Sequence, residues 1–113
     1  MPGIEPPTIA SDQDYARQLG ALATWEPLAR AALELAGIPQ PAHVQLADPL
    51  GTYPTLIADS RPRLVVKLFG ERYHGPESHA AEHAAYQVLA GQDLLVPRLV
   101  AAGDLFPHHP AWP

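Results

Sequence analysis

The sequence predicts an α+β domain, in which helices and antiparallel strands occupy separate stretches of the chain. Two observations lead to this class. Apolar residues recur at helical spacing within residues 11–37 and again within 76–91, whereas three short apolar runs separated by turn residues lie between positions 44 and 69. The 113 residues suffice for one modest domain, and 14 prolines divide it into short elements.

A helical extension is expected over residues 11–37, after a Pro-rich stretch, residues 1–10, that we expect to be a disordered leader. Ser11 followed by Asp14 resembles a capping box and predicts a helix over residues 12–21. Gly20 weakens the end of that helix.

A second helix is predicted over residues 25–36, with Thr24 as N-cap, Pro27 in the first turn and Gly37 as the stop. One stripe along this helix is expected to be buried. It comprises Leu28, Ala31, Ala32 and Leu35.

Strands follow a linker at residues 38–42, whose two prolines exclude regular structure. The runs at residues 44–46, 53–58 and 63–69 are separated by turn signals, so we expect an antiparallel meander. A last helix is predicted from Pro76 to Gly91, and a short fourth strand over residues 98–102. The apolar side of that helix is expected to be Ala81, Ala84, Ala85, Val88 and Leu89.

The charge and composition exclude several classes of function. The formal charge is −5 and no run of Lys or Arg occurs, which argues against nucleic acid and anionic membranes as partners. No stretch approaches the roughly 18 apolar residues of a membrane span. The chain has no Cys and no signal-like N-terminus, and we expect a cytoplasmic protein.

Lys67 is the residue most suggestive of chemistry. Strand alternation places Val65, Lys67 and Phe69 on one face of the third run, so an ammonium lies among apolar neighbours. A lysine at the rim of the sheet would explain this equally well. However, Glu82 follows 15 residues later, in the middle of the next helix. A strand lysine held by a helix glutamate is how protein-kinase-like folds bind ATP phosphates, although Glu77 is a competing partner.

Several segments together resemble the N-terminal lobe of the aminoglycoside phosphotransferase family, and most of all its hygromycin-kinase-like bacterial branch. The similar segments are residues 53–59, 63–69, 77–78 with 81–86, and 96–103. Residues 111–113 are similar to the lead-in to the hinge, and residues 25–28 are similar to the branch's N-terminal extension. The resemblance implies a protein-kinase-like N-lobe at residues 38–113, with four or five antiparallel strands and one αC-type helix.

This resemblance also implies roles for individual residues. Lys67 would bind the α and β phosphates of ATP, and Glu82 would be its ion-pair partner. Gly51 and Thr52 would belong to the loop that covers the nucleotide. The family's catalytic Asp and its Mg²⁺ ligands belong to a second lobe, and no H-x-D motif occurs in this sequence. We therefore expect an ATP-binding part of a small-molecule phosphotransferase that is inactive alone and lacks a catalytic residue of its own.

Two other functions remain open. A non-catalytic binding or regulatory module would keep the same fold without binding ATP. His79, Glu82 and His83 also match the H-x-x-E-H pattern of some zinc proteases, but a third ligand downstream is not evident. A lone N-lobe should in addition self-associate through its exposed lobe interface, which we expect to include Phe106 and Trp112.

Overall fold

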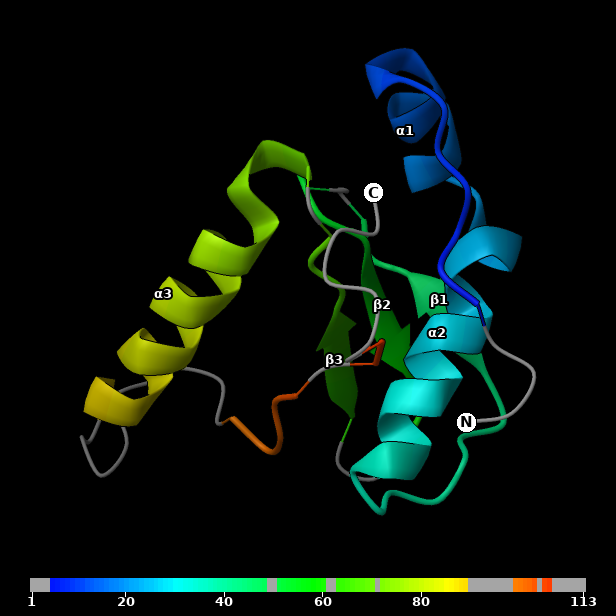
Figure 1. The fold of residues 1–113 in the computed structure, drawn as a ribbon. Coiled ribbons are helices and arrows are strands. Elements are labelled where there is room, and N and C mark those ends of the chain that lie inside the picture. Colours follow the sequence, from blue (N-terminus) through cyan, green and yellow to red (C-terminus); the bar gives the residue numbers. More distant parts are fainter. Residues whose placement is uncertain are drawn as a thin grey trace.

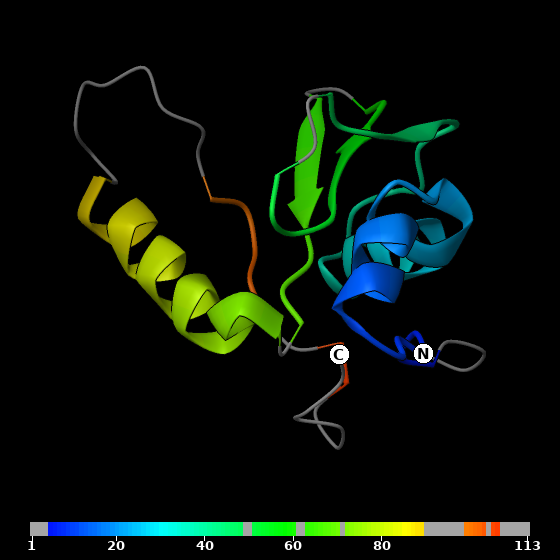
Figure 2. The same cartoon turned by 90° about the horizontal axis from the view of Figure 1, so that it is seen from above.

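The structure is a computed structural model, and it describes residues 5–48, 51–60, 63–70, 72–89, 99–103 and 105–106. A three-stranded antiparallel sheet lies between two N-terminal helices on one side and a third helix on the other (Figures 1 and 2). The elements in order are α1 (Asp12–Leu19), α2 (Leu22–Leu35), β1 (Val44–Leu46), β2 (Thr55–Ala58), β3 (Leu64–Lys67), the 3-10 turn η1 (Arg72–His74) and α3 (Gly75–Leu89). The α+β class is therefore confirmed.

The three strands form the predicted meander in the order β1, β2, β3. β2 is central, and its Leu56 pairs with Leu46 on one side and with Val66 on the other. Thr55 at the start of β2 pairs with Lys67 at the end of β3. Lys67 thus lies at the same end of the sheet as the connection from β1 to β2.

The expected four or five strands are not found in the part of the chain that the structure describes, which has three. Residues 99–102 form no strand, although a fourth strand was predicted there. They run between α3 and β3 in both views, with Val100 53% exposed (Figures 1 and 2). A strand needs a neighbouring backbone to pair with, and two apolar residues in sequence do not supply one. The predicted positions 91, 98 and 111–113 lie outside the described residues.

The core lies on the α2 face of the sheet. Trp25 is fully buried at its centre, and its indole N–H donates a 2.7 Å hydrogen bond to the carbonyl oxygen of Gln18. A buried indole needs such a partner, because an unpaired N–H would lose its hydration without compensation. The buried residues of this core cluster are Ile9, Tyr15, Trp25, Leu28, Ala29, Val44, Leu56 and Leu68. One core therefore joins the helical extension to the sheet.

The predicted cap of α1 and the stop of α2 are both confirmed. The Ser11 hydroxyl accepts a 3.1 Å hydrogen bond from the Asp14 backbone N–H. At the end of α2, Gly37 adopts a left-handed φ of 76°, and its N–H donates to the carbonyl oxygen of Glu34. Ile38 donates to Leu33 in the same turn, which completes a Schellman motif.

The predicted start of α2 and its buried stripe are partly wrong. The helix begins at Leu22, one turn before Pro27, and Ala21 rather than Thr24 is the N-cap. Leu22 packs against the core, so tertiary contact extends the helix beyond the point that Pro27 suggested. The predicted Leu35 is 60% exposed, whereas Leu33 is buried.

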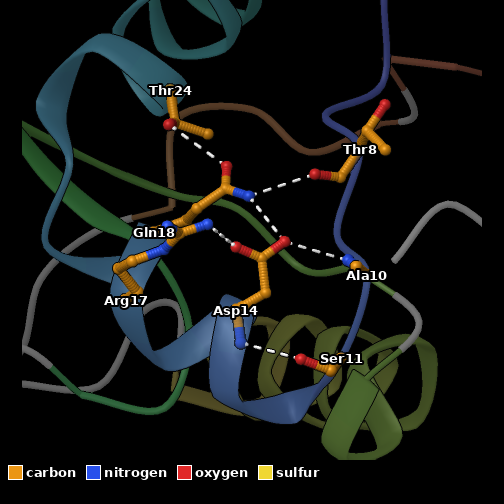
Figure 3. Close-up of polar contacts among 7 residues, drawn as sticks. All are labelled: Thr8, Ala10, Ser11, Asp14, Arg17, Gln18 and Thr24. Atoms are coloured by element: carbon orange, nitrogen blue, oxygen red, sulfur yellow. Dashed lines mark hydrogen bonds and ion pairs between the residues drawn. The ribbon is translucent and has the colours of Figure 1, made fainter.

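Residues 5–10, in the stretch expected to be a leader, carry no helix or strand but lie against the fold. Ile9 is buried in the core. One carboxylate, Asp14, gathers the polar contacts around this segment (Figure 3). It accepts hydrogen bonds of 2.9 Å from the Ala10 N–H and 3.0 Å from the Gln18 amide, and it forms an ion pair with Arg17. No helix in the described ranges has the length and apolar character that a membrane crossing requires.

The hydrogen bonds at Asp14 give a first prediction. The Ala10 N–H, followed by Arg17 and Gln18, lowers the pKa of Asp14 from 3.8 to about 2. A lowered folded-state pKa stabilises the protein above pH 3.8, and this contribution disappears as the pH falls towards 2. Asp14→Asn should therefore unfold more easily than the wild type in urea at pH 6, and the difference should shrink between pH 4 and pH 2. Asp48→Asn, which changes an exposed carboxylate outside this network, is the control; a pH-independent difference for Asp14→Asn would contradict the prediction.

Candidate functional site

The position of Lys67 follows from the alternation of side chains along β3. Leu68 is 5% exposed and belongs to the core on the α2 face, and Val66 packs against the same cluster. Val65, by contrast, is 63% exposed on the opposite face, which Lys67 shares. The predicted division of this strand into two faces is confirmed.

Lys67 and Glu82 meet, as their places on β3 and α3 predict. The Lys67 Nζ lies 3.0 Å from Oε2 of Glu82, a charge-assisted hydrogen bond between the sheet and the helix. The two side chains are 38% and 35% exposed, so the pair is half open to solvent. The competing candidate, Glu77, is exposed in the first turn of α3.

An aromatic cluster lies beside the ammonium. The Lys67 Nζ lies 5.4 Å from the centre of the Phe69 ring, within the range of a cation–π contact. The same ring lies 4.7 Å from Tyr53 and 5.3 Å from His79, measured between ring centres. Phe69 therefore bridges the sheet to α3 beside the ion pair.

The connection from β3 to α3 is tightly constrained. Tyr73 and His74 both adopt left-handed backbone conformations, with φ of 57° and 59°, which is unfavourable for such bulky residues. Gly75 is buried, and a Cβ at this position would lie 1.6 Å from the carbonyl oxygen of Gly70. Only a glycine permits this close approach.

The predicted apolar side of α3 is exposed except at Leu89, so this prediction is largely wrong. Ala81, Ala84 and Ala85 are exposed, and Val88 is 72% exposed. The half-buried residues of α3 are Ser78, His79, Glu82, His83, Tyr86 and Leu89. The helix is turned by its polar and aromatic contacts to Lys67, Phe69 and Tyr53, which hydrophobic periodicity does not encode.

The two predicted loop residues are exposed. Thr52 offers its carbonyl oxygen to the Tyr15 hydroxyl at 2.7 Å, so helix α1 holds this loop. A Cβ on Gly51 would meet open space, so nothing in the described surroundings requires a glycine there. The antiparallel pairing puts this connection at the Lys67 end of the sheet, while positions 49 and 50 lie outside the described residues.

The H-x-x-E-H residues do not form a metal centre in the described part of the chain. No group of three or more His, Asp or Glu side chains there is arranged to hold a metal ion. The rings of His79 and His83 stack with their centres 6.3 Å apart, and the intervening Glu82 is bound to Lys67. Zinc sites need at least three protein ligands.

No protein-family model matches this chain. The resemblance to aminoglycoside phosphotransferases therefore stays a prediction, and the geometry of the site has to carry any proposal about function.

Sequence reasoning missed the parts that Tyr53 and Phe69 play in this site. Tyr53 is 9% exposed, and its hydroxyl donates to the carbonyl oxygen of Tyr73. The same hydroxyl lies 2.9 Å from the side-chain hydroxyl of Ser78. The pattern of apolar runs predicts only that both aromatics belong to strands. The available signal was that Tyr53 comes two residues before β2 and Phe69 two residues after β3. The β2–β3 register puts both positions at the same end of the hairpin, next to Lys67.

The partial exposure of the ion pair predicts a small contribution to stability. Exposed pairs typically contribute about 0–1 kcal/mol to the free energy of unfolding. Lys67→Met and Glu82→Gln should each change that free energy, measured by urea denaturation, by less than about 1 kcal/mol. Glu26→Gln, which breaks the similarly exposed Arg30–Glu26 pair in α2, is the matched control. A loss several times larger at Lys67 would mean that the pair is a structural element.

The close approach at Gly75 gives another prediction. Gly75→Ala forces the chain apart from Gly70 and should displace the start of α3, because the Cβ has no space. We expect a lower unfolding temperature. We also expect the amide chemical shift of Glu82 to change in NMR spectra, because Glu82 would no longer lie beside Lys67. Gly51→Ala, where a Cβ meets open space, should leave both unchanged. Equal behaviour of the two variants would show that the β3–α3 connection tolerates a side chain.

Proposed function

We propose that this chain forms the ATP-binding N-terminal part of a protein-kinase-like small-molecule phosphotransferase, in which Lys67 binds the phosphates and Glu82 orients it. The observation that carries the proposal is the 3.0 Å contact between a β3 lysine and a carboxylate of the following helix. The proposal further takes the β1–β2 connection, with Gly51 and Thr52, as the loop over the nucleotide.

The chemistry of the pair supports phosphate as the ligand. A lysine ammonium has three donors, and a carboxylate that takes one of them fixes the flexible stem while the others stay available for phosphate oxygens. Lys67 is also the sole lysine of the chain, and 38% of its side chain is exposed, so a ligand can reach it. Preset charge of this kind lowers the entropic cost of binding.

Electrostatics indicates the form in which ATP would bind. The chain has a formal charge of −5, and Glu82 already offsets the charge of Lys67. Free ATP would be repelled by such a protein, whereas its magnesium complex carries less negative charge. No described residues form a magnesium site of their own. We therefore propose Mg²⁺–ATP as the ligand of this chain. By the family resemblance, phosphoryl transfer to a small-molecule hydroxyl acceptor would use residues of the second lobe.

The sole lysine permits a direct test. An acyl-phosphate derivative of ATP transfers its acyl group to amines near the bound phosphates, and here only Lys67 and the N-terminal amine can react. We expect mass spectrometry to find the acyl group on Lys67, and an excess of Mg²⁺–ATP to suppress it. In equilibrium dialysis, Glu82→Gln should weaken ATP binding about fivefold, as expected for the loss of a partly exposed ion pair that contributes up to about 1 kcal/mol. Glu26→Gln should bind ATP as the wild type does.

A folded wild-type chain whose Lys67 is acylated equally with and without excess ATP would remove the proposal. That result would favour the second reading, a binding or regulatory module with the same architecture and no nucleotide.

A further inference from the structure

The position of α3 is not fixed by burial of an apolar face. Its Ala81, Ala84 and Ala85 are exposed, and Val88 is 72% exposed. Among the described residues, its side-chain contacts with the sheet and its connections include the Lys67–Glu82 pair, the Tyr53–Ser78 hydrogen bond and the Phe69–His79 ring contact. Few-contact elements of this kind open at low free energy, so individual hydrogen bonds decide where they lie.

Tyr53 makes the hydrogen bonds at the start of this helix. It precedes β2 and is 9% exposed, with its ring held against Phe69 at 4.7 Å between centres. Its hydroxyl donates to the carbonyl oxygen of Tyr73 and lies 2.9 Å from the hydroxyl oxygen of Ser78. One phenol thus contacts both the left-handed connection and the first turns of α3. A strained backbone persists only where surrounding contacts determine it, and the Tyr73 carbonyl is one such contact.

The contact at Ser78 bears directly on Glu82. Residues four apart in a helix lie one above the other on the same face, so Ser78 and Glu82 face the sheet together. The contact at Ser78 fixes the rotation of α3 about its own axis and its position along the strands of the sheet. Glu82 then arrives at the level of Lys67, which is paired with Thr55, two residues after Tyr53.

Helix α1 supports Tyr53 from the other side. The Tyr15 hydroxyl donates to the carbonyl oxygen of Thr52, the residue before Tyr53, at 2.7 Å. The Tyr15 ring also lies 5.5 Å from the Tyr73 ring, measured between centres. The backbone that presents Tyr53 is therefore tied to the core through Tyr15, which is 5% exposed.

We propose that Tyr53 is a positioning residue of the phosphate-binding pair: its hydroxyl holds Tyr73 and Ser78, and thereby brings Glu82 to Lys67. The role in nucleotide binding rests on the function proposed above, whereas the effect of Tyr53 on the ion pair does not depend on it. Because Tyr15 of α1 holds the backbone next to Tyr53, the N-terminal helical extension also contributes to the site.

The reactivity of the sole lysine measures this effect without any nucleotide. An ammonium that is hydrogen-bonded to a carboxylate is shielded by it, so a small reagent such as acetic anhydride acylates it slowly. Glu82→Gln should raise the acylation rate of Lys67, relative to that of the N-terminal amine, about threefold. Tyr53→Phe keeps the ring and removes only the hydroxyl, and it should raise the rate to a similar extent. Tyr86→Phe, the same change on the half-buried Tyr86 of α3, should not alter it.

A double variant separates a positioning role from a general loss of stability. If Tyr53 acts through Glu82, Tyr53→Phe should have no further effect on the Lys67 rate in the Glu82→Gln background. Additive effects, or a Tyr53→Phe rate equal to that of the wild type, would overturn the proposal. Ser78→Ala removes the helix end of the same contact and should reproduce Tyr53→Phe, which provides the test should the tyrosine variant fail to fold.

The outcomes for the two proposals are distinct. Non-additive acylation rates without ATP binding would leave the positioning role of Tyr53 in place and remove the nucleotide function. ATP binding together with an unchanged acylation rate of Lys67 in Tyr53→Phe would support the nucleotide function and remove the positioning role of Tyr53. Where both proposals hold, Tyr53→Phe weakens ATP binding in equilibrium dialysis as much as Glu82→Gln does.

Discussion

The location of the candidate site depends on one constraint, the burial of a single face of the three-stranded sheet beneath α2. Leu68 and Val66 pack into that core, and the two-residue repeat of β3 then sends Lys67 and Val65 to the opposite face. A shift of the register by one residue would direct the ammonium towards the core around Trp25, where an unpaired charge is costly. Hydrophobic packing on one side of the sheet therefore decides where its charge lies on the other.

The features that could be predicted from the sequence are those set by neighbours along the chain. The Ser11 cap and the left-handed Gly37 depend on a few consecutive residues, and both occur as expected. The face that carries Lys67 follows from strand alternation alone. Its meeting with Glu82 required one further step, the assumption that the helix after β3 returns across that face, and the 3.0 Å contact agrees with it.

The features that could not be predicted depend on tertiary contacts. Helical periodicity indicated an apolar side for α3, but the contacts of Tyr53 and Phe69 turn the helix so that its polar residues face the sheet. Residues 99–102 begin with the apolar pair Leu99 and Val100 and yet form no ladder, because pairing depends on where a neighbouring strand lies. A tyrosine hydroxyl that bonds residues 20 and 25 positions away leaves no periodic signal in the sequence.

The proposed phosphate ligand would account for the Lys67–Glu82 pair better than stability does. Exposed pairs contribute about 0–1 kcal/mol to the free energy of unfolding. The similarly exposed Arg30–Glu26 pair needs no special backbone to form, because it joins successive turns of one helix. Lys67 and Glu82 instead lie on separate elements, joined by a connection that contains two left-handed residues and a glycine pressed against a carbonyl oxygen. Maintaining that connection costs free energy, and α3 buries little apolar surface to offset it. A binding site gains from such an arrangement because the ammonium is already oriented when a phosphate arrives.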